Sequence, residues 1–191
     1  MKVFFSASPR GKKNFKDEYL KIYQSLIKMG FTHLNSDVVS NDDNFYENLS
    51  AGGTNAYNKK YYQLLQAVKE ADIAIFECSS PSFAVGFLIE KAIQSSIPTI
   101  ALYSKNHTPH FLAGINDDKF QLVEYATSDL EQKIIDAVNK AVQLMDKRFN
   151  FFISPQLLTY LNNVSKEQRI SKSTFIRSLI IQHMKKQTSS K

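Results

Sequence analysis

Short apolar runs alternate with longer helical segments along the first 146 residues, and this alternation restricts the possible fold more than any other feature. The runs Ile73–Glu77 and Thr99–Tyr103 are almost entirely apolar, which is typical of strands that are covered on both faces. Further strands are expected at Val3–Ser6, Thr32–Leu34 and Gln121–Tyr125, and helices at about 15–29, 61–70, 83–94 and 128–146. Strands that alternate with helices predict an α/β fold, in which a parallel sheet lies between two helical layers.

Positive charge is concentrated at the C-terminal end. Residues 147–191 contain nine Lys or Arg and one acid, Glu167, and such a concentration favours contact with nucleic-acid phosphates. A solvated basic tail is the alternative, but this segment is patterned: a strand is predicted at Arg148–Ile153, a helix begins at Ser154-Pro155, and Ser171 caps a second helix. We therefore divide the chain into a domain at 1–146, a small module at 147–186 and a disordered tail at 187–191.

The small module resembles a known DNA-binding domain. Residues 148–186, a strand followed by "SPQLLTYLNNVSKEQRISKSTFIRSLIIQHM", closely resemble the ribbon-helix-helix domain of bacterial and phage repressors. So small a β-α-α unit buries too little apolar surface alone, so we expect it to form an intertwined dimer. The resemblance implies two sets of DNA contacts, to base edges from Arg148, Asn150 and Phe152, and to phosphate from Ser171, Lys172 and Ser173. Phe152 departs from the polar residue usual at its position, and a module used only for dimerisation is the alternative.

Two polar turns follow predicted strands of the first domain. "FSASPRGKK" follows the first strand and "ECSSPSFAVGFLIEKA" follows the strand at 73–77. Ligands of parallel sheets bind beyond the carboxyl ends of the strands, and helix N-termini beside small hydroxyl residues suit phosphate. Serine-rich turns also occur as ordinary turns and caps, so either segment alone leaves both interpretations open.

Together the two turns resemble the nucleoside 2-deoxyribosyltransferase family and its relatives, the deoxynucleoside monophosphate N-glycosidases. The resemblance covers about residues 1–145 and rests on "VFFSASPRG" and "VKEADIAIFECSSPSFAVGFLIEKAIQSSIPTIALY". It implies a flavodoxin-like or Rossmann-like sandwich. It also implies a nucleoside or nucleotide pocket formed by Ser6, Ser8, Arg10, Gly11, Ser82 and Gly86.

The catalytic acids of that family do not carry over to this sequence. The family's nucleophilic Glu ends a "GVGYE" run, and the corresponding residue here is Leu88; Leu64 stands at the position of the supporting Asp. Glycosyl transfer needs a carboxylate to stabilise an oxocarbenium-like centre. Glu90 is close in sequence but lies about 200° further round the helix. These positions predict no catalytic residue and a domain that binds without chemistry, although activity through Glu90 stays open.

The remaining signals are weak. His107 and His110 resemble a metal pair, but no third ligand is evident, and we expect neither a metal site nor a cofactor. The single cysteine, Cys78, excludes an internal disulfide and favours a cytoplasmic location. The chain has no apolar run of the length that spans a membrane.

The sequence therefore predicts a DNA-binding transcriptional regulator, a homodimer or higher even-numbered oligomer, whose degenerate first domain senses a nucleotide or related small ligand. Its expected partners are double-stranded DNA and that ligand, without a membrane. The alternative is an active nucleoside or nucleotide N-glycosidase or deoxyribosyltransferase that uses the C-terminal module for assembly. A scaffold with neither ligand nor operator is a third possibility.

Overall fold

The computed structural model describes residues 1–40, 44–145, 151–168 and 170–188. The chain divides into two compact units, Met1–Asp146 and Lys147–Lys191. Among the described residues, no helix has both the length and the apolar character needed to cross a membrane.

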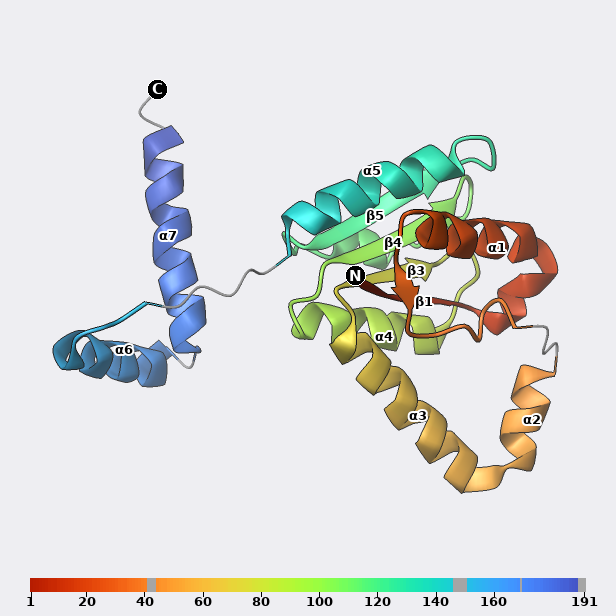
Figure 1. The fold of residues 1–191 in the computed structure, drawn as a ribbon, viewed down its shortest axis with the longest axis horizontal. Helices are drawn as coiled ribbons and strands as arrows, with labels where there is room; N and C mark the ends of the chain where they lie inside the picture. Colours follow the sequence, from red (N-terminus) through yellow and green to blue (C-terminus); the bar gives the residue numbers. More distant parts are fainter. Residues whose placement is uncertain (41–43, 146–150, 169, 189–191) are drawn as a thin grey trace. The chain divides into compact units, whose positions relative to one another are not determined.

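The first unit is built on a five-stranded sheet with the strand order β2-β1-β3-β4-β5 (Figure 1). All neighbouring strands are parallel, which confirms the predicted α/β fold. Ala7, the last residue of β1, pairs with Glu77, the last residue of β3, so both strands end at the same edge of the sheet. The strands are β1 (Lys2–Ala7), β2 (Thr32–His33), β3 (Ile73–Glu77), β4 (Thr99–Ser104) and β5 (Phe120–Tyr125).

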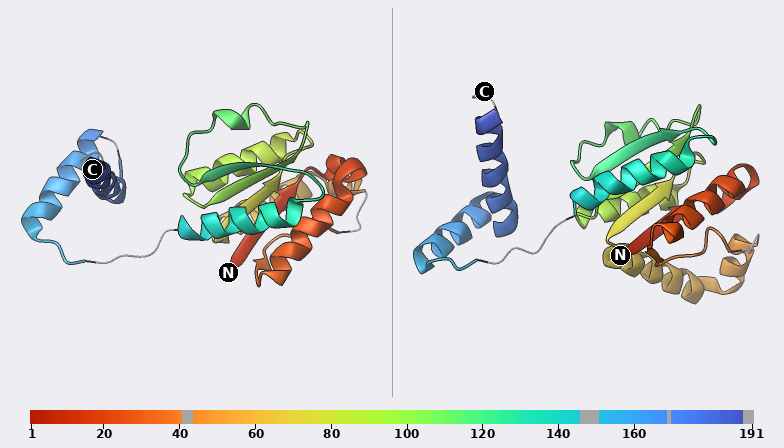
Figure 2. Two further views of the ribbon diagram at one scale, coloured as in Figure 1. Left: turned by 90° about the horizontal axis from the view of Figure 1, so that it is seen from above. Right: turned by 45° about the horizontal axis from the view of Figure 1, so that its top comes forward.

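Helices cover both faces of this sheet (Figures 1 and 2). α1 (Lys12–Lys28) and α5 (Leu130–Gln143) cover one face, and α3 (Gly53–Glu70) and α4 (Phe83–Gln94) cover the other. Successive residues of a strand point to opposite faces. Phe5 therefore packs into the core under α1 and α5, whereas Phe4 packs under α3 and α4.

The sequence predicts no element between the strand at 32–34 and the helix at 61–70, but the segment 45–58 is helical. α2 (Phe45–Ala51) and the first turns of α3 occupy it, and Gly53 has a φ of +60° where one helix gives way to the next. α2 has no buried residue and α3 buries only Val68. A helical segment without a buried face carries no apolar periodicity, so α2 and the first turns of α3 were not predicted, whereas the part of α3 that packs on the sheet was predicted at 61–70.

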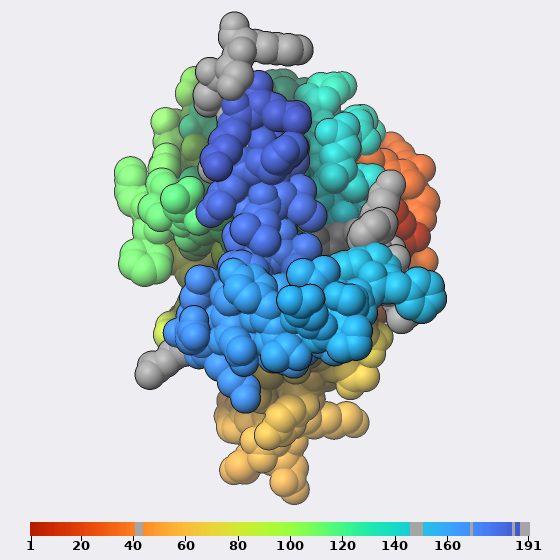
Figure 3. All heavy atoms as spheres, turned by 90° about the vertical axis from the view of Figure 1, so that its left-hand side faces the viewer, coloured from red at the N-terminus to blue at the C-terminus, as the bar shows by residue number. Residues whose placement is uncertain are grey.

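The second unit consists of α6 (Pro155–Gln168) and α7 (Lys172–Thr188), which cross each other (Figures 1 and 3). Side chains cap both helices, because Ser154 Oγ accepts a hydrogen bond from Leu157 N at 3.4 Å and Ser171 Oγ accepts one from Thr174 N at 3.1 Å. The small core between the helices is formed by Leu161, Val164 and Phe175.

The strand predicted at 148–153 and the disordered tail predicted at 187–191 are only partly covered by the described residues, and where they are covered the structure differs. The first residues of the predicted strand, 148–150, lie outside the described residues, and Phe151–Ile153 form no strand. A strand needs the backbone of another strand as its hydrogen-bonding partner, and one chain of a ribbon dimer supplies none. α7 continues to Thr188, so Gln187 and Thr188 belong to a helix rather than to a disordered tail. The ribbon-helix-helix arrangement stays a prediction.

Candidate functional site

The two polar turns meet at the carboxyl edge of the sheet, because β1 and β3 are neighbours. The first turn contains the short 3-10 helix η1 (Pro9–Gly11), and its Gly11 lies against the second turn. A Cβ atom added to Gly11 would stand 2.8 Å from Ser80 Cβ and 2.1 Å from Tyr19 Oη. Only a glycine allows the turns to approach so closely, which explains its place in "SPRG".

A fully buried carboxyl group, Glu77, joins the strand ends beneath these turns. Glu77 Oε1 accepts hydrogen bonds from Ser79 N at 3.2 Å and from Tyr125 Oη at 2.9 Å, and also from Ser79 Oγ. Ser79 Oγ in turn accepts a hydrogen bond from Ser104 N at 2.7 Å. The network connects the carboxyl ends of β3, β4 and β5, and so fixes the base of the site.

Burial dominates the electrostatics of this network. Burial raises the pKa of Glu77, and the hydrogen bonds from Ser79 and Tyr125 oppose that rise. Burial also raises the pKa of Tyr19, Tyr125 and Cys78, with the negative charge of Glu77 as a further cause. Sequence reasoning missed Glu77, although an acid at the end of the apolar run "IAIFE" is the signal that could have found it.

The central cavity, of about 180 Å³, lies on the α3 and α4 side of the sheet. It contains a carboxylate, since Asp37 Oδ2 lies 2.5 Å from Lys60 Nζ and both residues line the cavity. Leu64 and Leu88, which the sequence resemblance aligns with the family's acids, line it as well. The polar residues Ser6, Asn35 and Ser82 also line this cavity.

The basic cavity, of about 500 Å³, adjoins the central one. The two share Pro9, Phe45 and Tyr46, and the Arg10 guanidinium carbon lies 5.1 Å from the centre of the Tyr46 ring, a cation–π distance. The remaining residues of the basic cavity are all lysines, at positions 12, 13 and 16.

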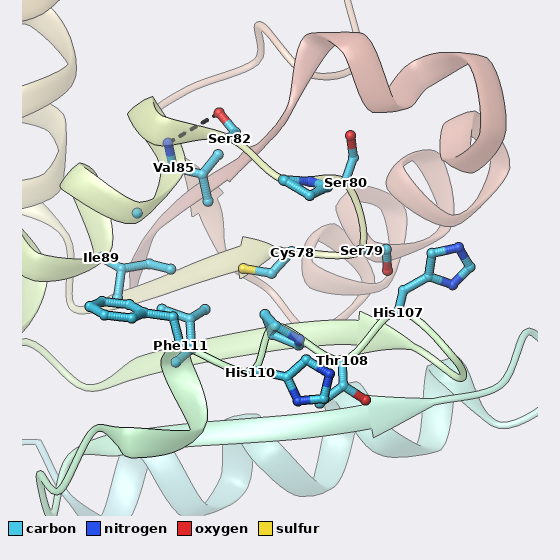
Figure 4. Close-up of a pocket in the computed structure, with 14 residues that line it drawn as sticks. Cys78, Ser79, Ser80, Ser82, Val85, Ile89, His107, Thr108, His110 and Phe111 are labelled. Carbon is cyan, nitrogen blue, oxygen red and sulfur yellow. Dashed lines mark hydrogen bonds between the residues drawn. The ribbon is translucent and has the colours of Figure 1, made fainter.

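The histidine-loop cavity, of about 370 Å³, lies on the other side of the N-terminus of α4 (Figure 4). It shares Ser82 and Val85 with the central cavity, and Ser82 caps α4 by accepting a hydrogen bond from Val85 N at 3.4 Å. Figure 4 shows the rings of His107 and His110 well apart on their loop. No group of three metal-ligating side chains occurs among the described residues, and the predicted lack of a metal site remains an expectation.

The predicted ligand residues lie at one edge of the sheet but do not share one cavity. Ser6 and Ser82 line the central cavity, Arg10 lines the basic cavity, and Gly86 joins Ser82 in the histidine-loop cavity. Ser8 and Gly11 are buried and line none of the three; Ser8 O accepts hydrogen bonds from Tyr19 Oη and Gly11 N. Their role as ligand contacts stays a prediction.

Glu90, considered above as a substitute acid, faces away from these cavities. It is exposed, its Oε1 accepts a hydrogen bond from Gln94 Nε2, and it lines none of the three cavities.

The described residues include only some of the predicted DNA contacts. Arg148 and Asn150 lie outside the described residues, whereas Phe152 is fully exposed. Ser171, Lys172 and Ser173 are exposed at the start of α7, and Lys172 Nζ donates a hydrogen bond to Asn162 Oδ1 of α6 at 2.9 Å.

Comparisons with known proteins give a consistent picture. No family model matches the sequence. The chain is 33% identical over 103 residues to a Syntrophotalea carbinolica protein provisionally named 2′-deoxynucleoside 5′-phosphate N-hydrolase 1, a match that covers 54% of this chain and 68% of the relative. A Thermofilum pendens protein of the same name is 27% identical over 137 residues, 70% of this chain and 90% of that protein. The solved structure of the Clostridium botulinum CMP N-glycosidase BcmB superposes with a TM-score of 0.50 at 17% identity, covering 73% of this chain and 98% of that one, which indicates a shared fold.

These comparisons contradict the predicted DNA-binding transcriptional regulator and the predicted absence of enzymatic activity. The relatives are named as enzymes that cleave nucleotides. The sequence argument rested on Leu64, Leu88 and Glu90 alone. The structure places a different carboxylate, that of Asp37, in the cavity that the two leucines line.

Proposed function

Since this chain belongs to the 2′-deoxynucleoside 5′-phosphate N-hydrolase family, we propose that it hydrolyses the N-glycosidic bond of a nucleoside 5′-phosphate. Water adds across the bond between the sugar C1′ and the base nitrogen. The sugar 5-phosphate keeps the hydroxyl group, and the departing base takes the proton.

The placement of Asp37 carries this proposal. Asp37 is the one carboxylate among the described residues that line the three cavities. Positive charge develops on the sugar as the base departs, and a nearby carboxylate stabilises it. Leu64 and Leu88 form the apolar part of the same wall, and an apolar surrounding strengthens the attraction between opposite charges. Lys60, paired with Asp37, holds the carboxylate in place.

The phosphate is assigned to the meeting point of the two polar turns. The Arg10 guanidinium, which lines the basic cavity, provides positive charge, and the N-terminus of α4, capped by Ser82 beside the central cavity, provides hydrogen-bond donors of the kind that a phosphate prefers. The central cavity of about 180 Å³ is smaller than the ~300 Å³ at the lower end of ligand pockets. A nucleotide whose sugar lies beside Asp37 must therefore extend into a neighbouring cavity.

The test is a screen for base release. The full-length chain is incubated with the 5′-monophosphates of each common base, in ribose and deoxyribose forms, and free base is separated by chromatography. We expect release from at least one nucleotide, and a loss of about 100-fold or more in Asp37→Asn, the scale typical of a carboxylate that acts in the transition state. Asp136→Asn, on the exposed face of α5, is the matched control and should keep full activity. Release at an unchanged rate by Asp37→Asn would overturn the assignment.

The C-terminal unit is proposed to assemble the enzyme with a second copy of the chain. Three residues form its buried core, whereas Leu157, Leu179 and Ile180 are 57%, 48% and 56% exposed. Apolar side chains in so small a unit are stabilised when a second copy covers them.

A further inference from the structure

We infer that the phosphate site continues into the basic cavity, and that the preferred substrates are nucleoside 5′-triphosphates rather than monophosphates. This inference rests on the proposed N-glycosidase function and narrows its substrate class. The basic cavity, defined above by Arg10, three lysines and the two aromatic residues of α2, supplies the evidence.

The charge of the basic cavity exceeds what one phosphate can neutralise. Arg10, Lys12, Lys13 and Lys16 line it, and none of the described lining residues is an acid. A phosphate monoester carries about two negative charges at neutral pH, so a monophosphate held by Arg10 would leave about half of the four positive charges uncompensated. A chain of phosphates brings further negative groups to the three lysines.

The basic cavity lies beside the central cavity, where the second and third phosphates of a triphosphate would extend. Its aromatic wall, Phe45 and Tyr46, is also a wall of the central cavity, and Pro9 belongs to both. Arg10 stands over Tyr46 at the junction. A substrate whose first phosphate lies beside Arg10 therefore directs its second and third phosphates toward the lysines. The volume of about 500 Å³ leaves room for them.

The three lysines differ in whether they already form a hydrogen bond or an ion pair with another residue of the protein. Lys12 Nζ donates a hydrogen bond to Ser40 O at 2.7 Å and so ties the turn to the region after β2. Lys13 and Lys16 are exposed, and within the described part of the chain neither forms an ion pair. Of the acids that follow on α1, Glu18 accepts a hydrogen bond from Thr127 Oγ1, and Asp17 is exposed outside the cavity lining. Lys13 and Lys16 are therefore the cations available for additional phosphates.

The first experiment compares base release from matched mono- and triphosphates of each base by three proteins. These are the wild type, the double variant Lys13→Ala/Lys16→Ala, and the control Lys133→Ala/Lys140→Ala, which removes the same charge from exposed positions of α5. In the wild type we expect kcat/KM to favour the triphosphate by about tenfold or more, the effect of at least one additional charge-assisted hydrogen bond. The double variant should lose this preference and keep its activity on monophosphates, whereas the control should behave as the wild type.

The second experiment measures binding of inorganic tripolyphosphate and inorganic phosphate by calorimetry. Tighter binding of tripolyphosphate that depends on Lys13 and Lys16 supports the inference; equal binding by the double variant overturns it. Equal kcat/KM for mono- and triphosphates overturns the inference and leaves the proposed function intact. Lysine-dependent tripolyphosphate binding without base release from any nucleotide contradicts the proposed function and, with it, the triphosphate preference, and leaves only a polyphosphate-binding site. Tighter binding of a single-stranded oligonucleotide than of triphosphates would assign the lysines to a nucleic-acid strand and would overturn the inference.

Discussion

Glu77 is the residue through which pH should act on the stability of the first domain. Its carboxyl group is fully buried, and burial raises its pKa above the ordinary value of 4.5. The folded state then binds a proton more tightly than the unfolded state. The stabilising effect is complete below the ordinary pKa and is lost as the pH rises through the raised pKa.

We therefore expect Glu77→Gln to flatten the pH dependence of stability. The glutamine oxygen can still accept the hydrogen bonds from Ser79 and Tyr125, but the side chain no longer ionises. As the pH rises above the ordinary pKa of 4.5 and through the raised pKa of Glu77, the free energy of unfolding of the wild type should fall relative to that of the variant. Chemical denaturation at a series of pH values measures both, and parallel curves would show that Glu77 does not control this dependence.

Gly11 should be the least tolerant glycine of the site. Gly11→Ala places a Cβ atom against Tyr19 Oη and Ser80 Cβ, and overpacking of this kind costs about 1–3 kcal/mol. Adding Tyr19→Phe removes the closest oxygen and should restore part of the lost stability. Gly86→Ala is the control, because nothing lies within 4 Å of its added Cβ. Denaturant unfolding tests the series; equal stability of Gly11→Ala and wild type would refute the close approach.

The elements were predictable from sequence where they bury a face, and unpredictable where they do not. β3 and β4 are apolar because both faces of the sheet are covered, so their positions follow from the pattern alone. α2 buries nothing and was missed. The ion pair of Asp37 with Lys60 joins a loop to α3 across more than twenty residues, and no local pattern encodes such a contact. For that reason Asp37, the carboxylate of the proposed chemistry, could not be identified from the sequence.

The exposed apolar residues of α6 and α7 lead to a prediction about assembly. Leu179→Lys together with Ile180→Lys should weaken self-association, because two charges then replace apolar side chains that a second copy would cover. Light scattering after size exclusion should give a dimer for the wild type and a smaller species for the variant. Thr159→Lys with Gln168→Lys, two exposed polar positions of α6, is the control and should stay dimeric. A monomeric wild type would contradict the proposed assembly.

For the whole molecule, we expect the first unit to bind the nucleotide and the second unit to supply self-association. All three cavities are lined by residues of Met1–Asp146. A chain truncated after Asp146 should therefore remain folded and bind a nucleotide, while losing the self-association that the C-terminal unit is proposed to supply. Circular dichroism, calorimetry and light scattering on one preparation test these outcomes together. Loss of fold on truncation would show that the first unit depends on the second.

The central claim is that a nucleotide bound beside Asp37 loses its base to water. The most direct measurement is a single-turnover reaction with enzyme in excess, in which free base and sugar 5-phosphate are quantified together. The account predicts equal amounts of the two products from the wild type. It predicts almost none from Asp37→Asn, even though that variant still binds the nucleotide by calorimetry. A wild-type protein that binds the nucleotide and returns it intact would contradict the account.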